Sequence, residues 1–108
     1  MLTAAHYNGE IIDILLRKCY PRDRVVHKKA SAVDLARTIT RLRYKSEYFD
    51  QLILECAEQH ISKQDVKRDE GFYFYILAFF AKMDAIRQFE QLLKSMAEIG
   101  AFEGIKAP

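Results

Sequence analysis

GFYFYILAFFAKMDAIRQFEQLLKSMAEIG, residues 71–100, is the stretch that decides the fold. It opens with ten apolar residues in succession, residues 72–81, and continues with apolar residues at helical spacing: Met83, Ile86, Phe89, Leu93 and Met96. No proline interrupts it, and Gly100 stands where a glycine commonly closes a helix. We therefore expect one helix of about seven or eight turns over residues 71–100, whose first half needs neighbours on several sides.

A second apolar stripe runs through residues 31–60 with alternating steps of four and three. Ser31 opens it, and Asp34 follows three residues later, as in a capping box. Eight positions keep the spacing, and Ser46 is the only polar one before the end: Leu35, Ile39, Leu42, Ser46, Phe49, Ile53, Cys56 and His60. This pattern predicts one unbroken helix of about 28 residues.

The N-terminal part predicts a shorter helix and a basic connector. The helix starts after Thr3 or Asn8, either of which can cap it, and it ends before Pro21. Residues 21–30 then form the connector. Its apolar pair, Val25 and Val26, either anchors the connector to the core through one helical turn or belongs to a solvated loop.

The elements together predict an all-α fold. We expect an antiparallel bundle of two long helices with a shorter N-terminal helix packed along them. A short connecting helix from Ser62 to Arg68 joins the two long ones. The 108 residues suit a single domain, residues 1–108, with a partly loose tail at residues 101–108 from which Phe102 can fold back.

The composition is that of a soluble globular protein. Half of the residues are hydrophobic and 30% are charged. The ten-residue apolar run is shorter than the ~20 residues of a membrane span. The first residues contain no charged segment leading into an apolar one, so we expect no signal peptide and a cytoplasmic location.

Candidate catalytic and metal-binding residues are few. Cys56 and His60 lie one helical turn apart and Cys19 is the only other cysteine, but a zinc site needs three or four ligands and no compact ligand motif is present. The acidic residues read as solvated helix faces, and no nucleophile or phosphate-loop motif occurs. We expect a protein that is not an enzyme and takes no metal, cofactor or small-molecule substrate.

The charge is distributed unevenly along the chain. Residues 1–45 carry ten basic and four acidic residues, a net +6, whereas residues 46–108 carry seven basic and eleven acidic residues, a net −4. Such a split suggests a polyanion-binding end or head-to-tail assembly.

The basic side chains predict a nucleic-acid-binding face on the second helix and the connector. Arginine binds phosphate oxygens through its planar fork, and a tyrosine ring can stack on an unpaired base. The candidate residues are Arg22, Arg24, Lys28, Lys29, Arg37, Arg41, Arg43, Tyr44, Lys45 and Tyr48. The alternative interpretation is a solvated face, with Tyr44 and Tyr48 packed against the first helix or against a neighbouring subunit.

Two functional hypotheses follow. The first is a non-catalytic subunit of a nucleoprotein complex that contacts nucleic-acid backbone without strong sequence preference and also contacts other protein subunits. The second is a protein-only adaptor or regulator, a homodimer included, that acts through an aromatic helix. For that interface we predict Tyr73, Leu77 and Phe80, which lie on a different side of the helix from Phe72 and Ile76.

Overall fold

The computed structural model describes residues 8–103, which form seven α-helices and no strand. In chain order these are α1 (Gly9–Cys19), α2 (Arg22–His27), α3 (Lys29–Leu42), α4 (Glu47–Gln59), α5 (Lys63–Arg68), α6 (Glu70–Lys82) and α7 (Ile86–Glu98). The all-α class is therefore correct. The predicted bundle of two long helices and a shorter one is wrong, because each long helix is a hairpin of two.

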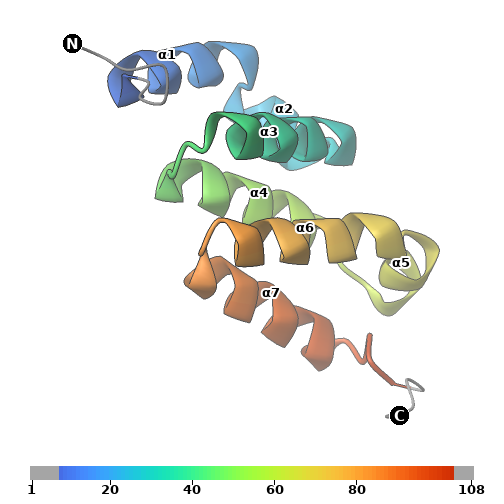
Figure 1. Cartoon of the computed structure of the whole chain (residues 1–108). Coiled ribbons are helices and arrows are strands. Elements are labelled where there is room, and N and C mark those ends of the chain that lie inside the picture. Colours follow the sequence, from blue (N-terminus) through green and yellow to red (C-terminus); the bar gives the residue numbers. More distant parts are fainter. Residues whose placement is uncertain (1–7, 104–108) are drawn as a thin grey trace.

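The two hairpins, α3–α4 and α6–α7, stack on each other (Figure 1). Helix α3 packs on α6 and α4 packs on α7, while α2 covers α4 and α3 and the short α5 lies against α6. Helix α1 lies beyond them at the N-terminal end, so the molecule is elongated, 54 × 31 × 19 Å.

The expected helix over residues 31–60 ends after Leu42. Arg43 takes a left-handed backbone conformation with a φ of 53°. The Tyr44 amide then donates to the Ile39 carbonyl at 3.1 Å and the Arg43 amide donates to the Thr40 carbonyl at 3.3 Å. This is the Schellman pattern that closes a helix.

The expected helix over residues 71–100 is interrupted by the same geometry. Asp84 has a φ of 58°, and the Ala85 amide donates to the Phe80 carbonyl at 2.8 Å. Gly100, with a φ of 74°, closes α7, and the Ala101 amide donates to the Met96 carbonyl at 2.9 Å. Gly100 thus ends a helix as expected, but it ends a helix of 13 residues.

The shorter elements agree with the sequence. Asn8 caps α1 by accepting from two backbone amides, and α1 ends just before Tyr20 and Pro21. Val25 and Val26 are buried within α2, so the apolar pair anchors the connector through a short helix. Ser62 caps α5.

Helix α6 lies at the centre of the core. Phe72, Ile76 and Phe79 are buried, as expected for core residues. Tyr73, Leu77 and Phe80 are buried as well, with exposed fractions of 0%, 8% and 0%. The predicted protein interface at these three residues is therefore wrong, because α3, α4, α5 and α7 together cover both stripes of α6. No helix within residues 8–103 is both long and apolar enough to cross a membrane.

Candidate nucleic-acid interface

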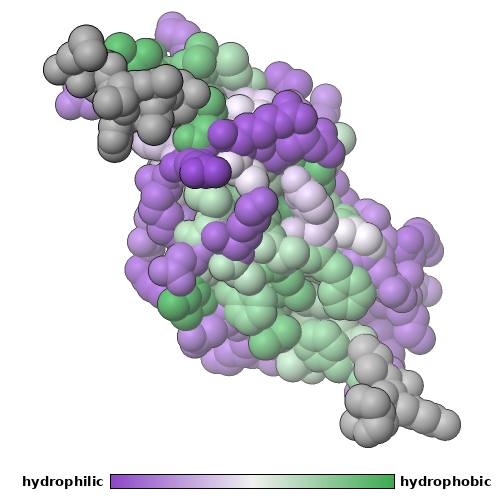
Figure 2. Space-filling model, viewed as in Figure 1, coloured by the Kyte–Doolittle hydropathy of each residue, from purple (hydrophilic) through white to green (hydrophobic). Residues whose placement is uncertain are grey.

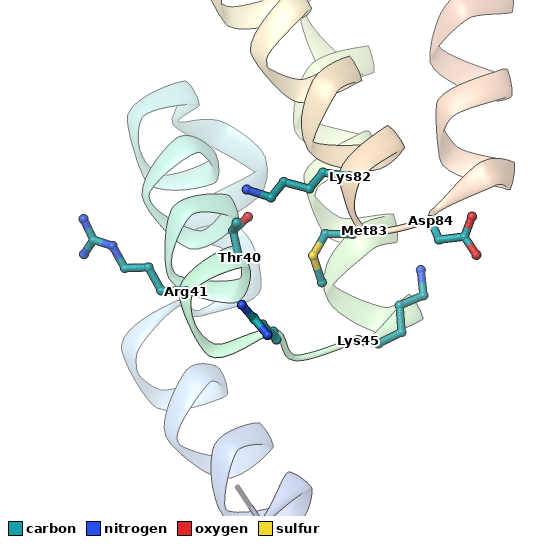
Figure 3. A pocket seen from close by; sticks show the side chains of 7 residues that line it. Thr40, Arg41, Lys45, Lys82, Met83 and Asp84 are labelled. Atoms are coloured by element: carbon teal, nitrogen blue, oxygen red, sulfur yellow. The ribbon is translucent and has the colours of Figure 1, made fainter. Parts of the chain in front are cut away.

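The connections of the two hairpins lie at the same end of the molecule and border one hollow (Figure 3). Its volume is about 830 Å³, and it is lined by residues of the α3 C-terminus, both connections and the α6 C-terminus: Thr40, Arg41, Arg43, Lys45, Lys82, Met83 and Asp84. Arg43 and Asp84, the two non-glycine residues with a left-handed backbone within residues 8–103, both belong to this lining. The hollow is therefore formed at the ends of α3 and α6, which the apolar periodicity of the sequence did not indicate.

The basic side chains of the hollow extend in different directions. Figure 3 shows the Lys82 side chain reaching from the end of α6 toward Thr40. It also shows Lys45 rising toward Asp84, and Arg41 pointing outward from α3. A ligand at this end would therefore meet positive charge from both hairpins.

The electrostatic balance of the lining is positive. The lining contains four basic side chains and a single acidic one, Asp84. Lys45 donates to the buried Asp50 carboxylate at 3.1 Å. Among the ion pairs of residues 8–103, none involves Arg41, Arg43 or Lys82. Part of this charge stabilises the helix ends, since Arg41 and Lys82 lie in last turns, where the helix dipole is negative.

Most of the connector cations are held by partners within the chain, at the opposite end of α3. Arg22 pairs with Glu55, and Arg24 contacts the Ser31 hydroxyl. Lys29 donates to Asp65 at 2.7 Å and to Asp69 at 3.0 Å. Lys28 is exposed between α2 and α3. The connector does not extend the hollow, because the 14-residue helix α3, about 20 Å long, separates them.

Arg37 lies about one helical turn before Arg41 on the exposed side of α3. Its guanidinium is 4.0 Å from Asp34, and both side chains are half exposed. A pair of this kind is weak in water and exchanges readily with a phosphate. Arg37 can therefore add to the positive surface beside the hollow.

The two predicted tyrosines face α1. The Tyr44 hydroxyl donates to Asp13 at 3.3 Å, and burial together with Asp13 raises the pKa of Tyr44. The Arg17 guanidinium lies 3.8 Å from the centre of the Tyr48 ring. Of the two packing partners that the alternative interpretation allowed, the structure therefore shows the first helix, and neither tyrosine lines the hollow.

Lys82, Met83 and Asp84 were missed by sequence reasoning. A continuous helix would have placed them within its middle turns, far from the start of α4. The available signal was Asp84, since aspartate tolerates the left-handed conformation better than most residues. The sequence could not show that this turn meets the α3–α4 connection.

The cysteine and histidine candidates do not converge. Cys56 is buried, and burial raises the pKa of its thiol to about 11. Cys19 is exposed at the end of α1, and His60, the C-cap residue of α4, is exposed as well. Within the part of the chain that the structure describes, no three histidine, cysteine or acidic side chains are grouped as metal ligands.

Comparisons with known proteins found no matching family model, no similar curated protein and no similar solved structure.

Proposed function

We propose that this chain is a non-catalytic, nucleic-acid-binding subunit that contacts the phosphate backbone through the hollow between its two hairpin connections. The observation that carries the proposal is that Arg41, Arg43, Lys45 and Lys82 line one hollow whose lining holds a single acidic residue. Three of these four cations have no acidic partner within residues 8–103.

The chemistry of the lining favours phosphate over other anions of similar charge. Arginine presents a planar fork that fits two phosphate oxygens, and lysine supplies a point charge that tolerates different geometries. The hollow can therefore receive successive phosphates of one strand, with Arg37 adding a contact along α3. Contacts to phosphates fix a protein on nucleic acid and carry no direct sequence information.

The hollow favours backbone recognition over base stacking. None of its seven lining residues is aromatic, and Tyr44 and Tyr48 are engaged with α1. Since strong binding of single strands relies on aromatic stacking, we expect duplex to bind at least as tightly as single strands.

Fluorescence anisotropy with labelled single- and double-stranded DNA and RNA tests this function. Neutralising about three phosphates predicts an affinity for duplex that falls about 40-fold between 50 and 200 mM salt. The Arg41→Ala/Lys82→Ala variant, which loses one cation from each hairpin, should bind about tenfold or more weakly at low salt.

The matched control is Lys67→Ala/Arg68→Ala, which removes the same charge from exposed positions on α5. This control should keep most of the affinity, because it does not touch the hollow. Equal losses in both double variants would show that net charge alone drives binding. Absence of binding at low salt would overturn the proposal.

A further inference from the structure

The outer side of the α6–α7 hairpin carries an exposed apolar surface. Ile86 is 57% exposed, Leu93 39% and Phe74 48%, with Phe89 half-buried beside them. Figure 2 shows hydrophobic side chains gathered over α6 and α7, below the hydrophilic ones over α3. The inner sides of both helices already pack on α3 and α4, so this outer surface is a separate one.

The apolar residues of α7 form a seam suited to another helix. Ile86, Phe89, Leu93 and Ala97 follow one another at steps of three and four, which places them in one line along the whole helix. Such a line is typical of a side that packs against a second helix. Ile86, Leu93 and Ala97 are exposed in the structure.

The charges beside this seam indicate what kind of helix fits. Glu90 and Lys94 are exposed along one border of the seam and form no ion pair within residues 8–103. In an antiparallel pair of α7 helices centred near residue 92, each Glu90 lies opposite the Lys94 of the other copy. The midpoint of the apolar seam from Ile86 to Ala97 also lies within one residue of residue 92, so the same antiparallel arrangement aligns the two seams. In a parallel pair the two-fold axis would run along the helices and place the borders that carry Glu90 and Lys94 on opposite sides of the seam, so these charges would not pair.

We propose that the outer side of α7 binds a second copy of this chain, with the two α7 helices antiparallel. Two-fold symmetry forms the pair between Glu90 and Lys94 twice and covers Ile86 and Leu93 of both copies. Arg87 takes no part, since it already pairs with Glu47 of α4 at 2.7 Å. The interface is distinct from the hollow, so it does not depend on nucleic-acid binding.

Sedimentation velocity of the full chain, without nucleic acid and from about 10 to about 500 µM, tests the proposal. We expect a reversible monomer–dimer equilibrium within this range. Ile86→Lys/Leu93→Glu should abolish the dimer. The matched control is Ile11→Lys/Ile14→Glu, which changes two similarly exposed residues of α1 and should leave the dimer intact.

A charge exchange tests the antiparallel direction. Glu90→Lys alone or Lys94→Glu alone creates two like-charged contacts per dimer and should weaken dimerisation about tenfold. Glu90→Lys/Lys94→Glu together recreates both pairs with reversed signs and should restore dimerisation to within about threefold of wild type.

The proposal is overturned if the wild type stays monomeric throughout the range, if the α1 variant rather than the α7 variant abolishes the dimer, or if the double exchange fails to recover it. Circular dichroism of each variant checks that the helices are retained.

Discussion

Lys45 donates a hydrogen bond to Oδ2 of Asp50 at 3.1 Å, and this carboxylate is only 1% exposed. The bond joins the α3–α4 connection to the first turn of α4. The other oxygen of Asp50, Oδ1, is buried and accepts no hydrogen bond from residues 8–103. Lys45 therefore stabilises a buried charge and at the same time borders the hollow.

Replacing Lys45 with alanine should destabilise the protein. The substitution leaves the Asp50 carboxylate without its donor, and an unsatisfied buried group costs about 1–3 kcal/mol. Because Lys45 itself is half exposed, we expect the lower part of this range. Urea unfolding at pH 7 measures the change. Lys18→Ala, which removes an exposed lysine with no ion pair within residues 8–103, is the matched control and should change stability by less than about 0.5 kcal/mol.

Because of the buried Asp50 carboxylate, we also expect the free energy of unfolding to depend on pH. Burial raises the pKa of Asp50 from its ordinary 3.8, against the opposing effect of Lys45. Since the folded state holds this proton more tightly than the unfolded state, the contribution of Asp50 is greatest below pH 3.8 and is lost as the pH rises through the folded pKa. Asp50→Asn should therefore gain stability relative to wild type between pH 3 and pH 7. If the difference in unfolding free energy between Asp50→Asn and wild type stayed constant across this range, the raised pKa of Asp50 would be contradicted.

The contribution of Asp65 to stability depends on pH in the opposite direction. Burial alone would raise its pKa, but hydrogen bonds from Lys29 and Tyr73 outweigh burial and lower it. Its stabilisation is therefore present above pH 3.8 and is lost as the pH falls through the folded pKa. Asp65→Asn should cost about 1–2 kcal/mol at pH 7 and progressively less in acid.

Chemical denaturation at several pH values checks this difference, with Asp69→Asn as the control. Asp69 also accepts from Lys29, but its side chain is 46% exposed, so its loss should cost less. An equal effect of the two substitutions would show that Asp65 has no special role.

The sequence predicted the helical class and the short helices because their signals are local. Asn8 and Ser62 are capping residues, and Pro21 prevents α1 from continuing. The two hairpin connections were missed because each hairpin keeps its apolar spacing across the break. Periodicity does not separate one long helix from two antiparallel ones that bury the same stripe. Ser46 was the available sign, since this one polar residue of the stripe is the N-cap of α4.

The candidate site was less predictable than the fold class. Arg41, Arg43 and Lys45 were selected from the sequence and lie together at the hollow. Their fourth partner, Lys82, comes from the other hairpin, and only the tertiary structure brings it there. The aromatic residues Tyr73 and Phe80 were assigned to a surface because the expected bundle had too few helices to cover them.

The two cysteines should differ in reactivity. Cys56 is buried, and its thiol has a pKa raised to about 11, whereas Cys19 is exposed. The thiolate is the reactive form, so an aromatic disulfide reagent at pH 8 should modify one thiol per native chain and two per chain unfolded in guanidinium. Cys19→Ser should remove the rapid reaction. Rapid modification of both thiols in the native protein would contradict the burial of Cys56.

Replacing Arg43 with glycine should stabilise the fold while weakening nucleic-acid binding. Arg43 has a φ of 53°, a conformation that glycine adopts without the steric cost of a Cβ atom. The relief of about 1–2 kcal/mol of steric cost exceeds the entropy cost of glycine, about 0.5–1 kcal/mol, so we expect a net gain of about 0.5–1 kcal/mol in the free energy of unfolding. Arg41→Gly is the matched control, because position 41 is helical and glycine should there cost about 0.5–1 kcal/mol.

Both variants remove one cation from the hollow, so both should bind nucleic acid more weakly in the anisotropy assay. Opposite changes in stability with parallel losses of affinity would separate the structural role of the α3–α4 turn from its charge. If Arg43→Gly destabilises the protein as much as Arg41→Gly does, the left-handed turn at residue 43 is wrong.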